Sequence, residues 1–83
     1  MEDIARTVKE FLLDRFLQGE DPALLTPTTP LITGGILDSL ATLDLVAFLE
    51  KRFGVEFEAH EVDKDRLDTI ELITALVKGK LGK

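Results

Sequence analysis

The hydroxyl of Ser39 is the side chain best placed to do chemistry, because it stands where a stretch with helical apolar periodicity begins. The residues just before it are Gly35-Ile36-Leu37-Asp38. The first turn of a helix offers unpaired backbone N–H groups and the positive end of the helix dipole, and both favour an attached phosphate. Serine is also a good helix cap. Position alone therefore favours a plain cap, and the surrounding residues must decide between the two.

Nucleophilic catalysis by Ser39 would need a base within reach, a group that orients the base, and an oxyanion hole. The chain has a single histidine, His60, and the sequence around Ser39 is not a Gly-x-Ser-x-Gly elbow. The neighbouring Asp38 cannot by itself make Ser39 a good nucleophile at neutral pH. We therefore expect that the protein is not an enzyme.

A run of acidic residues invites a calcium interpretation, because Asp63 and Asp65 match the opening of an EF-hand loop. The later positions do not fit. Leu67 takes a ligand position, Asp68 stands where glycine is required, and Thr74 replaces the closing glutamate. We expect a solvated acidic surface here and no metal site.

Length, charge and cysteine content narrow the class of protein. The chain has 83 residues, no cysteine and a formal net charge of −6, which predicts one small domain spanning residues 1–83. Binding to a nucleic-acid backbone needs clustered Lys and Arg, so nucleic acid is excluded as a partner. The amino terminus is acidic, and the longest apolar run is too short to cross a bilayer. We expect a cytoplasmic monomer that is not embedded in a membrane.

The elements that must position Ser39 begin with a predicted amphipathic helix over residues 3–17, in which apolar residues recur at helical spacing from Ile4 to Phe16. The segment 18–38 is predicted to be a long loop, because Pro27 and Pro30 cannot continue a helix. Gly34 and Gly35 give backbone freedom where the chain turns into the next helix. Six apolar residues are expected to hold the loop across the bundle: Leu24, Leu25, Leu31, Ile32, Ile36 and Leu37.

Residues 39–52 are predicted to form the second helix, which has two apolar faces. One face is a core stripe formed by Val46, Leu49 and Phe53, with Leu45 and Phe48 in support. The other face carries Leu40, Leu43 and Ala47, flanked by Asp44 and Lys51. This second face could be more core or a partly exposed docking surface, and the pattern does not choose between them.

The rest of the chain predicts an extended connector over 55–58, a short helix over 60–64 and a final helix. Gly54 suits the end of the second helix. Asp68 with Glu71 resembles a capping box for the final helix, whose apolar face would include Leu72 and Leu76 with Ile70, Ile73 and Val77. Lys78, Lys80 and Lys83 match the negative end of that helix's dipole. The predicted fold is all-α, a small four-helix bundle with three longer helices, one short helix and a long loop between the first two.

The residues Gly35-Ile36-Leu37-Asp38-Ser39-Leu40 and the later Phe53-Gly54-Val55 resemble the acyl, peptidyl and aminoacyl carrier proteins of thioester assembly lines. The similarity extends over nearly the whole chain. It implies that Ser39, with Asp38 as its motif neighbour, is the attachment point of 4'-phosphopantetheine, whose thiol carries an acyl cargo.

The same resemblance implies a set of partners. A phosphopantetheinyl transferase would supply the catalytic groups and coenzyme A, an acyl- or aminoacyl-loading enzyme would charge the thiol, and an acyltransferase or synthase would take the cargo onward. The docking surface implied by the family consists of Leu40, Leu43, Asp44 and Ala47.

Details of the motif separate types of carrier. Carriers of fatty-acid synthases usually have acidic residues two and five places after the serine, where this chain has Ala41 and Asp44. The segment from Leu49 to Glu56 is more similar to free-standing carriers, namely D-alanyl carriers and discrete carriers of specialised metabolism. We favour a specialised carrier, with a D-alanyl carrier for cell-wall polymer modification as the alternative. A helical interaction module that has lost its cargo is the alternative from another class.

Overall fold

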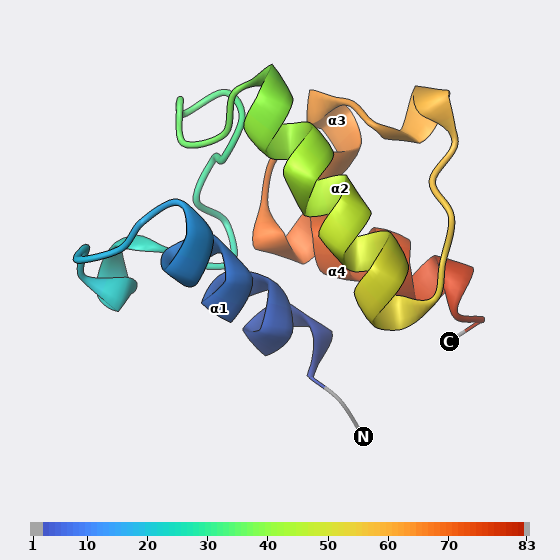
Figure 1. Ribbon diagram of the computed structural model, residues 1–83, viewed down its shortest axis with the longest axis horizontal. Coiled ribbons are helices and arrows are strands. Elements are labelled where there is room, and N and C mark those ends of the chain that lie inside the picture. Colours follow the sequence, from blue (N-terminus) through green and yellow to red (C-terminus); the bar gives the residue numbers. More distant parts are fainter. Residues whose placement is uncertain (1–2, 83) are drawn as a thin grey trace.

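The computed structural model describes residues 3–82, and their regular structure is helical throughout. As the sequence predicts, three longer helices and one short helix form a small bundle (Figure 1). In chain order the elements are α1 (Ile4–Arg15), the 3-10 helix η1 (Pro22–Leu24), α2 (Ser39–Phe53), the 3-10 helix η2 (Ala59–Glu61), α3 (Lys64–Leu67) and α4 (Ile70–Lys80). Lys83 lies outside the described residues.

Helix α1 begins where the side chain of Asp3 accepts a hydrogen bond from the backbone N–H of Arg6. Its residues Ile4, Val8 and Leu12 are buried, at the helical spacing that the sequence predicts. The helix packs against α4. It ends at Arg15, two residues before the predicted boundary, because its last turn leads into the Gly19 turn and Pro22.

The core draws apolar side chains from all four α-helices and from the long loop. Leu25, Leu31 and Leu37 are buried, so they hold the loop across the bundle as predicted. One predicted loop anchor is wrong, because Leu24 is 63% exposed. Leu72, which was expected on the apolar face of the final helix, is also exposed. The buried cluster consists of Ile4, Val8, Leu12, Leu25, Leu31, Leu37, Leu45, Val46, Leu49, Leu67, Ile70, Ile73 and Val77.

Helix α2 ends at Gly54, whose φ of 68° places it in the left-handed conformation that glycine adopts without strain. Residues 55–58 then run as an extended connector, as predicted. A carboxylate oxygen of Glu50 accepts a hydrogen bond of 2.9 Å from the N–H of Phe57, which ties this connector to the last turns of α2.

The predicted helix over 60–64 is wrong in its bounds. A 3-10 turn occupies Ala59–Glu61, and α3 begins only at Lys64 because the Asp63 side chain caps the N–H of Arg66. The predicted capping box of Asp68 and Glu71 is also wrong. Thr69 is the cap of α4, since its Oγ1 accepts a hydrogen bond of 3.0 Å from the N–H of Leu72.

Candidate functional site

Ser39 is the first residue of α2, and its side chain is exposed. The cap of this helix is Asp38, whose Oδ1 accepts a hydrogen bond of 2.8 Å from the N–H of Ala41. The Asp38 carbonyl also accepts hydrogen bonds from the N–H and Oγ1 of Thr42. The interpretation of Ser39 as a plain helix cap is therefore wrong. Within residues 3–82, no hydrogen bond involves the Ser39 hydroxyl.

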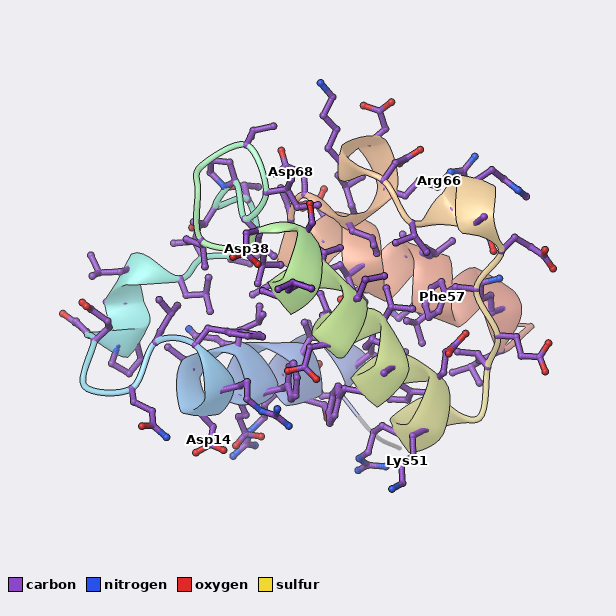
Figure 2. All side chains as sticks on the ribbon, turned by 45° about the horizontal axis from the view of Figure 1, so that its top comes forward. Asp14, Asp38, Lys51, Phe57, Arg66 and Asp68 are labelled. Atoms are coloured by element: carbon purple, nitrogen blue, oxygen red, sulfur yellow. The ribbon has the colours of Figure 1, made fainter. Side chains whose placement is uncertain are left out.

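The backbone around Ser39 offers a favourable place for negative charge. Ser39 and Leu40 belong to the first turn of a 15-residue helix, where backbone N–H groups have no intrahelical acceptor. At the other end of the helix, the last turn contains Lys51, labelled in Figure 2, and Arg52. The helix dipole therefore has its positive end beside the Ser39 hydroxyl, and basic side chains complement its negative end.

The turn that leads into α2 depends on two glycines. A Cβ on Gly34 would lie 2.2 Å from the carbonyl oxygen of Pro30, so this position cannot accept a larger residue without a backbone shift. Gly35 has a φ of 84°. The N–H of Leu37 donates a hydrogen bond of 2.8 Å to the carbonyl of Leu31, which closes the base of the turn. Ser39 thus follows a tightly folded segment, although the loop as a whole is long.

Asp68, at the junction of α3 and α4, holds this turn through hydrogen bonds. Its Oδ1 accepts hydrogen bonds from the N–H groups of Ile32 (2.8 Å) and Thr33 (2.9 Å), and its Oδ2 accepts one from Thr33 Oγ1 (2.8 Å). The N–H of Leu31 donates to the Asp68 carbonyl. The hydrogen bond from the Thr33 backbone is the largest of the effects that lower the pKa of Asp68, with partial burial acting against it. Sequence reasoning missed this role, because all of its partners are distant in the chain.

A surface hollow of about 500 Å³ adjoins Ser39 between the start of α2 and the start of α3. Apolar side chains form much of its wall, among them Leu37, Leu43 and Val62. Asp63 and Lys64 contribute charged groups of opposite sign. The hollow can therefore hold a chain of mixed polarity that begins at the Ser39 oxygen.

The other expected site residues lie along one side of α2. Leu40 is 78% exposed, Leu43 is 58% exposed, and Ala47 is also exposed. This face is therefore an exposed apolar strip and not additional core. The fourth residue, Asp44, is only half-exposed, because its carboxylate lies 2.9 Å from Arg15 Nη1 of α1.

The described residues contain no group of three or more His, Asp and Glu side chains arranged to hold a metal ion. His60 is exposed on η2. Between residues 3 and 82, the helices are all too short or too polar to cross a membrane.

Comparison with known proteins agrees with the geometry. A scan against models of protein families finds no match for this chain. A curated D-alanyl carrier protein from Lacticaseibacillus casei (strain BL23) is 35% identical over 77 residues, which cover 93% of each chain. That similarity spans α1 to α4 almost completely, and the helical bundle fits it. The chain belongs to the carrier-protein family of the acyl-carrier type, and its role is that of a carrier protein.

Proposed function

We propose that Ser39 bears a 4'-phosphopantetheine group and that the protein carries an acyl or aminoacyl cargo on it between biosynthetic enzymes. The observation that carries this proposal is the exposed Ser39 hydroxyl, which makes no hydrogen bond within residues 3–82 and stands at the amino terminus of α2. When bound, the group supplies a terminal thiol that holds the cargo as a thioester. Ser39 is also the only serine in the chain.

Attachment requires little from the carrier itself. The Ser39 oxygen forms a bond to the phosphorus that bears pantetheine in coenzyme A, the phosphoanhydride bond breaks, and adenosine 3',5'-bisphosphate leaves. The serine proton goes to a base of the transferase, since Asp38 is engaged as the helix cap. The chain supplies an accessible hydroxyl in a fixed position, and it needs no catalytic base of its own.

The surroundings of Ser39 fit a phosphodiester with a flexible arm. The first turn of α2 stabilises a negative charge through its N–H groups and the helix dipole, which offsets repulsion from the nearby Asp38 carboxylate. Leu37 and Val62 give the adjoining hollow an apolar wall against which methylene groups can lie, and Lys64 offers a positive charge.

We assign docking of the transferase and the loading enzyme to the strip formed by Leu40, Leu43 and Ala47. Leu40 and Leu43 are exposed next to Ser39 and are well suited to burial against a partner. Leu43→Ala should raise the KM of the transferase for the carrier. Leu72→Ala removes an exposed leucine from α4 instead and is the matched control, with no expected change in KM.

The cargo has two candidates. The free-standing carrier pattern fits a discrete carrier of specialised metabolism and a D-alanyl carrier alike, and the similarity to a D-alanyl carrier protein favours D-alanine. Loading assays separate them. The modified protein is incubated with ATP, D-alanine and a D-alanine-activating enzyme, and in parallel with adenylating enzymes for other acids. A D-alanyl thioester formed at a rate that other acids do not match supports the D-alanyl carrier.

Incubation with coenzyme A and a broad-specificity phosphopantetheinyl transferase tests the attachment itself. The wild type should gain one prosthetic group, and Ser39→Ala should gain none while keeping its helical content and stability. A wild type that stays unmodified under conditions where another carrier is fully converted would contradict the proposal and favour the helical interaction module.

A further inference from the structure

We propose that Asp68 is a positioning residue for Ser39: it fixes the loop that enters α2, so that the hydroxyl meets the modifying enzyme in one backbone conformation. This inference rests on the proposed function, because it concerns how the same serine is presented. Figure 2 shows Asp68 and Asp38 at the same end of the molecule, near the loop before α2.

Asp68 is suited to this role by the number of loop groups that it binds. Its two carboxylate oxygens accept three hydrogen bonds of 2.8 to 2.9 Å from Ile32 and Thr33, and its carbonyl accepts a fourth from Leu31. Hydrogen bonds to an ionised carboxylate are stronger than those between neutral groups. The side chain at the junction of α3 and α4 therefore orders two successive residues of the loop, and its backbone carbonyl binds the residue before them.

A continuous set of contacts leads from Asp68 to the site. The Asp68 side chain holds Ile32, and the preceding Leu31 donates its N–H to the Asp68 backbone carbonyl and accepts at its own carbonyl the N–H of Leu37. Leu31 and Leu37 are both buried, so neither end of this connection can move without exposing a leucine. Leu37 is followed directly by the cap residue Asp38 and then by Ser39. The position of the α2 amino terminus is thereby joined to that of Asp68.

The loop has a second, independent attachment to α4. The N–H of Glu71 donates a hydrogen bond of 3.0 Å to the carbonyl of Pro27, and it does not involve the Asp68 side chain. Leu25 is also buried, so the earlier part of the loop should stay in the core when Asp68 is replaced. An Asp68 variant should therefore fold, with its disorder confined to the part of the loop between Pro30 and Ser39.

Two substitutions at Asp68 distinguish positioning from general stability. Asp68→Ala removes all three side-chain hydrogen bonds. Asp68→Asn keeps one oxygen for the N–H groups of Ile32 and Thr33 and offers an amide to the Thr33 hydroxyl, which can accept as well as donate. Asp21→Ala is the matched control, because it removes an acidic side chain that bonds a local N–H, that of Ala23, in the same loop.

Amide hydrogen exchange of the unmodified protein is the first measurement. Asp68→Ala should speed exchange at Ile32 and Thr33 by about tenfold, since these amides lose their acceptor. Exchange at Leu37 should speed up less, because its acceptor Leu31 keeps its hydrogen bond to the backbone carbonyl of residue 68. Asp68→Asn should restore most of the protection, and Asp21→Ala should leave these amides unchanged.

Kinetics of modification by the transferase is the second measurement. Asp68→Ala should raise KM by about three- to tenfold with little change in kcat, because the enzyme must order the loop on binding. Asp68→Asn should have a KM close to that of the wild type. The KM of the control Asp21→Ala should equal that of the wild type. Unchanged exchange in Asp68→Ala, or an equal KM increase in Asp21→Ala, would overturn the inference.

A wild type that is not modified at all would instead overturn the proposed function, and the exchange result would still decide whether Asp68 orders the loop.

Discussion

The guanidinium of Arg15 lies 2.9 Å from the carboxylate of Asp44 and joins α1 to α2 beside the exposed leucines. Arg15 also lies over the ring of Phe11, 5.4 Å from its centroid, and Phe11 in turn stacks on Phe48 of α2. The acidic residue that the family resemblance assigns to docking is thus already held by a base of the same chain. A partner that binds Asp44 must compete with Arg15 or contact both.

Arg15→Gln should therefore affect docking more than stability. An exposed ion pair contributes at most about 1 kcal/mol, and an exposed cation–π contact a similar amount, so the free energy of unfolding should fall by less than about 2 kcal/mol. If Asp44 binds a basic group of the transferase, Arg15→Gln lowers the KM and Asp44→Asn raises it. The control Arg6→Gln removes an equal charge from α1, where Arg6 pairs only loosely with Glu10 at 3.9 Å. Identical KM values in all four proteins would remove Asp44 from the docking surface.

The capping arrangement predicts that substitutions at the adjacent residues Asp38 and Ser39 change the free energy of unfolding by different amounts. Asp38→Ala should lower the free energy of unfolding by about 1 kcal/mol, because the N–H of Ala41 loses its acceptor. Asp38→Asn should cost much less, since asparagine caps nearly as well. Ser39→Ala should change stability by less than about 0.5 kcal/mol, because its hydroxyl makes no hydrogen bond in residues 3–82. Urea denaturation measures all three, and a Ser39→Ala cost equal to that of Asp38→Ala would contradict the assignment of the cap.

Two neighbouring leucines of the long loop should differ sharply. Leu25 is 1% exposed and belongs to the core, so Leu25→Ala should cost about 2 to 5 kcal/mol. Leu24 is 63% exposed, and Leu24→Ala should stay within about 0.5 kcal/mol of the wild type. Thermal or urea unfolding of the pair tests whether the loop is part of the folded core. Equal costs would mean that the loop does not pack as described.

Acid should weaken the fold through Glu61 and Asp68. The hydrogen bond from Lys80, at 2.6 Å, is the main cause that lowers the pKa of Glu61, and the Thr33 N–H does the same for the pKa of Asp68. Because each pKa is lower in the folded state, these carboxylates stabilise the fold at neutral pH, and this contribution is lost as pH falls through the range in which they protonate.

Glu61→Gln should therefore be less stable than the wild type at pH 7, and the difference should shrink as the pH is lowered. Lys80 Nζ also lies 5.1 Å from the centroid of the Phe57 ring, so the lysine keeps one favourable contact in the variant. The control is Glu20→Gln, which removes an exposed acid from the long loop. Urea unfolding between pH 3 and pH 7 gives the result, and a constant difference across that range would contradict the role of the Glu61–Lys80 pair.

Local sequence patterns predicted the elements whose determinants lie close together in the chain. The spacing of Ile4, Val8 and Leu12 placed α1, and Gly54 marked the end of α2. Local sequence does not distinguish which of two adjacent polar residues caps a helix. Ser39, next to Asp38, was therefore a candidate cap of α2, and Asp68, next to Thr69, was predicted to cap α4. Both assignments failed for one reason: a carboxylate or hydroxyl bonds whichever N–H the folded backbone brings near.

Hydrogen bonds and ion pairs between distant segments could not be predicted from local sequence patterns. Asp68 binds Ile32 and Thr33, Arg15 binds Asp44, and Glu61 pairs with Lys80, and none of these pairs has a signature in its local sequence. The exposure of Leu40 and Leu43 was likewise undecided, because helical periodicity gives the face of a residue but not what covers it. The motif identified Ser39 as the candidate attachment residue. Only the structure shows how the loop before α2 holds Ser39 in place.

Fragmentation mass spectrometry of the protein after transferase treatment shows directly whether Ser39 is the attachment point. The tryptic peptide between Arg15 and Lys51 contains Ser39 and five threonines, so fragment ions must assign the adduct to one hydroxyl among six. We expect one phosphopantetheine on Ser39 and none on Thr42 or any other threonine. An adduct on a threonine, or a peptide that stays unmodified while a reference carrier is converted, would contradict it.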